Sequence, residues 1–235
     1  MRAFILGNSG ELLDHDLSLL QGEVVFGSNA IALRCPEIIT NYVCADIVTA
    51  FLPEMRGMIS HSAKRHYSRI VWNTIDHEDN VEVFDTIDGQ PGFNFSTSDV
   101  YLCNTVAYAS LQIAACLNYN PIYLLGVDLG TPTNGIHYIP EQYVMNEMLR
   151  KKNLRNTNAD KRVAVSSYDE TSKKINMDFI YAQDILKDEG IEVFNLSTGG
   201  NLKAFPRKVY KQVLSNHQTG IMSEVELNNK EIVNA

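Results

Sequence analysis

Long hydrophobic runs are missing from this sequence. No apolar stretch approaches the roughly 20 residues that a helix needs to cross a bilayer. The N-terminus begins directly with a strand-like segment, without the charged and apolar regions of a secretory signal. These absences predict a soluble, cytoplasmic protein and leave peripheral association with a membrane surface open.

Paired cysteines are also missing. Four cysteines stand alone among apolar residues, with no C-x-x-C spacing and no histidine-rich neighbourhood: Cys35, Cys44, Cys103 and Cys116. This pattern favours buried free thiols in a reducing compartment over a zinc site.

Positive charge is scarce. The 20 Lys and Arg residues against 28 Asp and Glu residues give a net charge of −8. General nucleic-acid binders are usually basic, so we expect no nucleic-acid partner, although a local basic patch is compatible with this total. The chain has no internal repeat, and 45% of its residues are hydrophobic, which is enough for a substantial core.

Short apolar segments recur along the chain and predict buried strands. They are continuously apolar rather than alternating, as in a parallel sheet covered on both faces. These segments lie at residues 3–6, 23–27, 41–46, 69–73, 121–128 and 191–196. Helices are expected at 98–120, where Ser98–Asp99 offers an N-cap, and at 169–190. The alternation predicts an α/β fold with a Rossmann-like, doubly wound, mainly parallel sheet.

The composition along the chain predicts one domain at residues 1–215, with a polar insertion at about 129–168. A long polar segment inside a compact domain is commonly a lid or binding loop. Residues 216–235 are polar and are expected to form a C-terminal tail.

Polar or glycine-rich residues follow most of the predicted strands, and these ends meet at one edge of a parallel sheet. In open α/β sheets, ligands bind beyond the carboxyl ends of the strands. The candidates for nucleotide binding are the first loop (Gly7, Asn8, Ser9 and Gly10), Asn29, Asp46, Asp128 and the turn at 195–200. The first loop is G-x-x-G; it is neither the full G-x-G-x-x-G pattern nor a P-loop with its lysine.

The polar insertion concentrates the positive charge of this acidic chain. Its basic residues are Arg150, Lys151, Lys152, Arg155, Lys161 and Arg162. They form either a solvated surface loop or a flap that closes over an anionic ligand such as a nucleotide phosphate.

His137 and Tyr138 follow the strand end at Asp128 by nine and ten residues. An imidazole in that place can act as a general base or donate to a phosphate. The remaining histidines, at positions 15, 61, 66, 77 and 217, are interpreted as surface residues.

Six segments resemble, in their order and spacing, the MptE-like (DUF115) family and the related bacterial sialyltransferases that use CMP-sialic acid. The segments are FILGNSGELL (4–13), VVFGSNAIAL (24–33), NYVCAD (41–46), NTVAYASLQIAACLNYNPIYLLGVDL (104–129), NGIHY (134–138) and IEVFNLSTGGNLKAFPRK (191–208). The resemblance covers about residues 3–210.

This resemblance implies a nucleotide-binding fold that performs group transfer. In the sialyltransferase relatives, the positions that match Gly7, Asn8 and Asn29 bind the CMP-sugar. The helix-start hydroxyl corresponds to Asn104–Thr105, and the strand-end acid corresponds to Asp128.

The pterin branch of the family implies another reaction. There, pyrophosphate is transferred from ATP to a hydroxymethylpterin with Mg²⁺, and Asp46 and Asp128 would be the metal ligands, since Mg²⁺ prefers carboxylate oxygen.

The chain departs from the family pattern in three places. Glu11 stands where a small hydroxyl is common, and its carboxylate would repel a phosphate unless it points away. No histidine lies between His137 and His217, so the catalytic histidine of the sialyltransferases has no counterpart. Of their two phosphate-binding tyrosines, the first is replaced near Leu129, and only His137 or Tyr138 can stand for the second.

Three functions stay open. The favoured one is a nucleotide-sugar glycosyltransferase of sialyltransferase type that acts on a surface glycan or its precursor, because GGNLKAFPR resembles the polysaccharide-cluster branch. It would use a CMP-type donor, with His137 and Asp128 as catalytic residues and no permanently bound cofactor. The second is a diphosphokinase that needs ATP and Mg²⁺. The third is a non-catalytic nucleotide-binding relative. A homo-oligomer is compatible with each.

Overall fold

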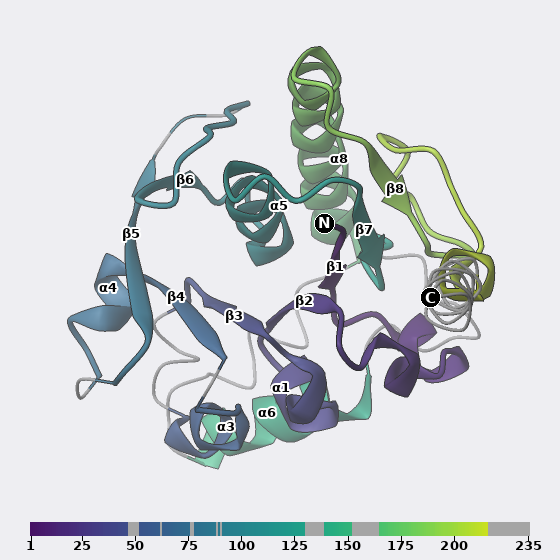
Figure 1. The fold of residues 1–235 in the computed structure, drawn as a ribbon. Helices are drawn as coiled ribbons and strands as arrows, with labels where there is room; N and C mark the ends of the chain where they lie inside the picture. Colours follow the sequence, from purple (N-terminus) through teal and green to yellow (C-terminus); the bar gives the residue numbers. More distant parts are fainter. Residues whose placement is uncertain are drawn as a thin grey trace, which may run out of the picture.

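A computed structural model describes residues 1–46, 52–61, 63–75, 78–87, 89, 91–129, 139–151 and 165–215. Within these residues, eight strands form one sheet in the order β6-β5-β4-β3-β2-β1-β7-β8 (Figure 1). Every neighbouring pair is parallel. The strands are β1 (Ala3–Leu6), β2 (Val24–Ser28), β3 (Asn41–Cys44), β4 (Lys64–Ser68), β5 (Val81–Ile87), β6 (Asp99–Tyr101), β7 (Ile122–Leu125) and β8 (Val193–Asn195). The expected α/β Rossmann-like class is confirmed.

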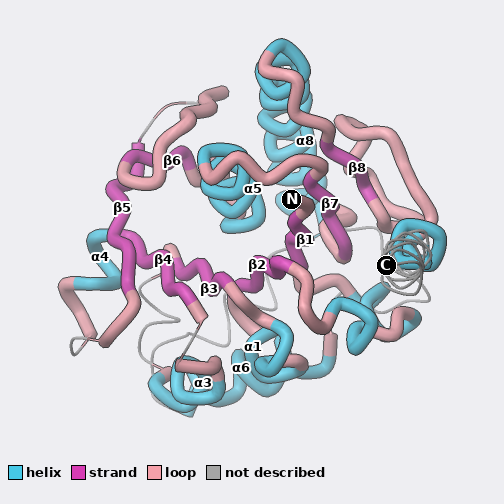
Figure 2. Tube along the Cα trace, viewed as in Figure 1, coloured by secondary structure: helices cyan, strands magenta, loops and turns pink. Residues whose placement is uncertain are grey.

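Helices cover both faces of the sheet (Figure 2). One face carries α5 (Val106–Cys116) and α8 (Val165–Asp188), and the other carries α1 (Ile31–Arg34), α3 (Pro53–Met58) and α6 (Pro140–Lys151). The short helices η1 (Gly10–Asp14), η2 (Leu17–Leu20), η3 (Pro36–Ile38) and α4 (Arg69–Trp72) lie in the connections.

Side chains of β1 show why its sequence is continuously apolar. Phe4 and Leu6 join one hydrophobic cluster, and Ala3 and Ile5 join the cluster on the opposite face. Because successive strand residues point to opposite faces, a strand covered on both sides must be apolar at every position.

The direction of winding reverses beside β1. The chain moves outward from β1 to β6, and α5 then returns it to β7, which pairs with the free side of β1 (Figure 1). The carboxyl ends of β1 and β7 are therefore the topological switch point, where open α/β sheets bind their ligands.

The prediction of a strand at residues 69–73 is wrong. Residues 69–72 form α4, which Ser68 caps by accepting a hydrogen bond from the N–H of Val71. The strand lies just before it, as β4, and its polar residues Arg65 and His66 are buried. A prediction based on apolar runs misses a buried strand that carries polar side chains. Such side chains can be buried because residues distant in the sequence provide their hydrogen-bond partners.

The helix expected from residue 98 begins later. Residues 99–101 form β6, and positive φ angles at Cys103 (44°) and Asn104 (61°) interrupt the chain before α5. The N-cap is Thr105, whose side chain accepts from the N–H of Ala107, and it is not Ser98–Asp99. The strands β5 and β6, at one end of the sheet, were not expected, because few of their residues are buried.

Part of the predicted insertion belongs to the core. Ile139 and Met145 are buried in the cluster that contains Leu6 and Leu125, and Arg34 pairs with Glu141 of α6 at 3.2 Å. The described segment 139–151 therefore packs on the sheet.

The four cysteines are free, and three of them are buried, as expected; Cys116 is half-buried. Across the described residues, no helix combines the length and the apolar character that crossing a bilayer requires.

Candidate functional site

The loop after β1 lies directly against the end of β7. The N–H of Gly7 donates to the carbonyl of Leu125 at 2.9 Å, and the N–H of Ser9 donates to the carbonyl of Gly126 at 3.2 Å. A Cβ atom on Gly7 would overlap the carbonyl oxygen of Gly126. Glycine is required at position 7 because the two backbones approach so closely.

Ser9 and Asp128 meet at the switch point. The Ser9 hydroxyl donates to Oδ2 of Asp128 at 2.5 Å, and the two residues are only 3% and 7% exposed. The Ser9 oxygen also accepts the N–H of Glu11, which caps η1. Ser9 thereby fixes the first loop and the strand-end carboxylate relative to each other.

Asn8 connects the loop to β2. Its amide nitrogen donates to the carbonyl of Ser28 at 3.2 Å, next to Asn29, which has a φ of 52°. The backbone carbonyl of Asn8 accepts from the N–H of Ile139 at 3.1 Å. The side-chain oxygen of Asn8 is buried and has no hydrogen-bond partner among the described residues. A buried acceptor of this kind is destabilising unless a ligand or water donates to it.

Glu11 turns inward from the loop. It is 1% exposed, its Oε1 accepts the N–H of Thr198, and His15 Nε2 lies 3.6 Å from the same oxygen. Burial acts to raise the pKa of Glu11, but His15, Thr198 and Ser197 stabilise the carboxylate and lower it overall. The charge is therefore held inside the protein, which answers the concern that Glu11 would face a bound phosphate.

The glycine-rich turn after β8 contacts Asp128 at the same edge of the sheet. The N–H of Asn201 donates to the backbone carbonyl of Asp128 at 2.6 Å, and a Cβ on Gly200 would overlap that same oxygen. The guanidinium of Arg207 donates to the carbonyls of Ser197 and Gly200. Three loops, after β1, β7 and β8, are thus in direct contact.

Other predicted nucleotide-binding residues lie elsewhere along the edge. Asp46 follows β3, and three strand spacings, about 14 Å along the sheet, separate β3 from β7. One Mg²⁺ binds its ligands at about 2.1 Å, so this placement gives no support to a shared ion on Asp46 and Asp128. Asn104 and Thr105 follow β6 at the end of the sheet, where Thr105 caps α5.

Several predicted residues fall outside the description. His137, Tyr138, Lys152 and Arg155 lie outside the described residues, as does the side chain of Arg150, whereas Lys151 is exposed at the end of α6. Within the described part of the chain, no three His, Cys, Asp or Glu side chains are grouped as metal ligands.

Two cavities lie away from the loops at the switch point. One borders Tyr123 and Lys208, and the other borders Cys116 and Glu189. Neither is lined by the first loop or by Asp128.

Sequence reasoning missed the residues that hold the three loops together. His15 was interpreted as a surface residue, yet it faces Glu11 and its ring packs 4.9 Å from that of Tyr210. His66 was also placed on the surface and is fully buried. Glu11 and His15 are four positions apart, about one helical turn, and this spacing is a weak sequence signal that the two side chains meet. The contacts of Thr198 with Glu11 and of Arg207 with Ser197 leave no such pattern in the sequence.

Comparisons with protein-family models, with curated proteins and with solved structures gave no match.

Proposed function

We propose that this chain is a nucleotide-binding transferase that uses a nucleotide-sugar donor and resembles the bacterial sialyltransferases of the MptE-like group. The nucleotide would lie at the switch point, against the first loop. Asn8, Ser9 and Gly10 would contact its phosphate or ribose groups, together with Asn29 from the neighbouring strand end.

The contact between Ser9 and Asp128 carries this proposal. It joins the loop after β1 to the acid after β7 at the point where the winding of the sheet reverses. Ligands of open α/β sheets bind at that point. The unpartnered oxygen of Asn8 supports the same location, because a ligand donor such as an amino group of the base or a ribose hydroxyl would satisfy it.

The proposed reaction moves a sugar from the nucleotide to an acceptor hydroxyl. The bond between the anomeric carbon and the phosphate oxygen breaks, the nucleotide leaves with the electron pair, and the acceptor oxygen forms the new bond. A base must take the acceptor proton, and we assign this role to His137 on the sequence evidence. A well-placed base contributes a factor of about 10² to 10⁴.

The orientation of Glu11 removes one argument for a non-catalytic relative. Its carboxylate is enclosed by Thr198, Ser197 and His15, so the first loop is not lined by an exposed negative charge. The diphosphokinase alternative receives no comparable support, since Asp46 and Asp128 follow strands three spacings apart.

The test is a thermal-shift panel on the full chain with CMP, CMP-sialic acid, UDP-sugars, GDP-sugars and ATP, with and without Mg²⁺. A ligand at 100 times its dissociation constant adds about 2.7 kcal/mol to the free energy of unfolding. We expect a cytidine nucleotide to stabilise the protein, and Ser9→Ala to weaken that binding.

Ser18→Ala is the matched control, because Ser18 is an exposed serine of η2 whose N–H and hydroxyl donate to the side chain of Asp16, the N-cap of that helix. Stabilisation only by ATP with Mg²⁺ would replace the glycosyltransferase by the diphosphokinase. Equal nucleotide binding by Ser9→Ala and the parent protein would remove the nucleotide from the first loop.

A further inference from the structure

A cavity of about 530 Å³ lies beside residues 207–213, called the C-terminal segment below, and outside the site proposed above. It is lined by Arg2, Tyr123, Arg207, Lys208, Val209 and Val213, among others. Its size falls within the range of about 300–1,000 Å³ that small-molecule sites occupy.

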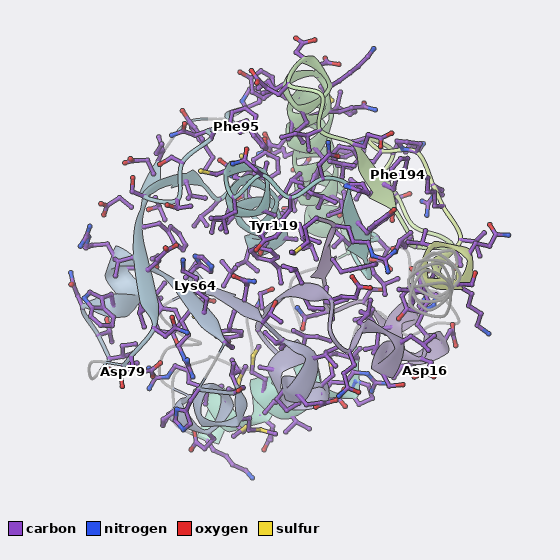
Figure 3. All side chains as sticks on the ribbon, viewed as in Figure 1. Asp16, Lys64, Asp79, Phe95, Tyr119 and Phe194 are labelled. Atoms are coloured by element: carbon purple, nitrogen blue, oxygen red, sulfur yellow. The ribbon has the colours of Figure 1, made fainter. Side chains whose placement is uncertain are left out.

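An aromatic ladder lies beside the cavity, and its middle member, Tyr123, lines it. Phe4, Tyr123 and Phe194 occupy paired positions on β1, β7 and β8, with ring centroids 5.0 Å and 5.7 Å apart. Figure 3 labels Phe194 on β8, at the outer end of the ladder. The Lys208 ammonium lies 3.3 Å from the centroid of the Phe194 ring, and the Arg2 guanidinium lies 5.3 Å from that of Phe4. The ring faces thus hold two cations beside the cavity.

The positive charges here are only partly balanced. Arg2 forms a two-bonded ion pair with Glu23. Arg207 donates to two backbone carbonyls and Lys208 contacts a ring, and no Asp or Glu among the described residues pairs with either cation. Arg207 and Lys208 are exposed residues that both line the cavity, and an anion bound there would be attracted to both charges.

Tyr123 adds a neutral donor. Its ring is enclosed in the ladder and the residue is 6% exposed, yet no described residue hydrogen-bonds to its hydroxyl. Burial, the largest effect, raises the pKa of Tyr123, so the hydroxyl keeps its proton at neutral pH and can donate. Val209 and Val213 supply an apolar wall on the side of the C-terminal segment.

We propose that this cavity binds a small organic phosphate. Arg207 and Lys208 hold the phosphate oxygens, the Tyr123 hydroxyl donates to one of them, and the carbon skeleton lies against Val209 and Val213. A phosphate monoester carries about −1.5 to −2 charges at neutral pH, which matches the two uncompensated cations better than a single carboxylate does. The planar guanidinium also suits a phosphate geometrically.

Isothermal titration calorimetry of the full chain with glycerol 3-phosphate tests this site. We expect saturable binding with one ligand per chain, weakened at least about tenfold by Lys208→Gln and several-fold by Tyr123→Phe. Lys211→Gln is the matched control, because Lys211 is exposed on the same segment and does not line the cavity. Its affinity is expected to equal that of the parent protein.

A second arm distinguishes a soluble phosphate from a lipid headgroup. Co-sedimentation with phosphatidylcholine vesicles, with and without phosphatidic acid, reports whether Lys208 contributes to membrane binding. Loss of vesicle binding in Lys208→Gln, without loss in Lys211→Gln, assigns the phosphate to a lipid; binding of glycerol 3-phosphate alone assigns it to a soluble ligand.

Three results would overturn the site: no saturable binding of either probe, equal weakening by Lys208→Gln and Lys211→Gln, or weakening by Ser9→Ala with none by Lys208→Gln. The last result would move the phosphate to the first loop. Conversely, absence of nucleotide binding at Ser9 leaves the Lys208 measurements unaffected, so the two proposals fail separately.

Discussion

The carboxylate of Glu11 accepts the backbone N–H of Thr198, 187 positions further along the chain, and so connects the first loop to the turn after β8. Glu11→Gln keeps the size of the side chain and removes its charge. We expect a loss of about 1–3 kcal/mol in the free energy of unfolding at neutral pH, since a charged, buried acceptor is replaced. Urea denaturation measures it, with the exposed Glu37→Gln as control.

The same carboxylate predicts a pH dependence. Although burial opposes it, the interactions with His15, Thr198 and Ser197 lower the pKa of Glu11 in the folded state. A lowered carboxyl pKa contributes stability above the unfolded value, about 4.3, and that contribution is lost as the pH falls through the folded value. The difference between the parent protein and Glu11→Gln should therefore shrink below about pH 4.3. A constant difference down to pH 3 would contradict this assignment.

His66 predicts a second acid-sensitive contribution. It is fully buried in β4, its Nε2 lies 3.1 Å from Oδ1 of Asn41, and Glu82 and Lys64 are its charged neighbours. Burial lowers the pKa of His66 from 6.5 to about 4, partly opposed by Glu82. The unfolded chain binds the proton first, so stability falls as the pH drops from 6.5 towards 4.

The slope of this loss is at most about 1.4 kcal/mol per pH unit, the value for one proton. His66→Gln retains a donor for Asn41 and should flatten the pH dependence of stability in this window. The exposed His61→Gln is the control and should leave the slope unchanged. Identical slopes in all three proteins would show that His66 does not titrate in this way.

Gly200→Ala should lower the stability by more than the backbone strain of a positive φ, because the added Cβ also disturbs the contact between two loops. Gly200 has a φ of 86°, and a Cβ there would meet the backbone oxygen of Asp128. Gly22 has nearly the same φ, 85°, but nothing lies within 4 Å of its Cβ position. Gly22→Ala therefore measures the left-handed backbone penalty alone, about 1–2 kcal/mol.

We expect Gly200→Ala to cost at least about 1 kcal/mol more than Gly22→Ala, since the turn must move away from Asp128. Thermal unfolding of both variants gives the difference. Equal losses would mean that the turn adjusts without strain, and the proposed close contact of the loops would be wrong.

Variants of Thr105 distinguish a structural role of this residue from a contact with the nucleotide. Its side chain caps α5 by accepting from the N–H of Ala107 at 3.4 Å. Thr105→Ala should cost about 0.5–2 kcal/mol, and Thr105→Ser should recover most of this, because serine is an equally good cap. If Thr105 also contacts the nucleotide, Thr105→Ala weakens nucleotide binding as well. Unchanged binding with lowered stability would limit Thr105 to the cap.

Much of the fold follows from local patterns. The apolar segment 3–6 predicted β1 with its observed bounds, and the amphipathic pattern after residue 169 predicted most of α8. The segment 69–73 misled the same reasoning, because a short apolar run is compatible with a helix turn such as α4. The same reasoning missed β4, because its polar residues Arg65 and His66 are stabilised inside the sheet by residues outside the strand, including Glu78 and Asn41.

The amino-acid sequence by itself determined that buried parallel strands end in polar loops, since this depends on apolar runs and on glycines that follow them within a few residues. Only the tertiary structure decided that β7 lies beside β1, that Ser9 meets Asp128, and that Glu11 turns inward to Thr198. Strand order is set by how helices such as α5 return the chain across the sheet, and contacts between residues more than a hundred positions apart depend on that order.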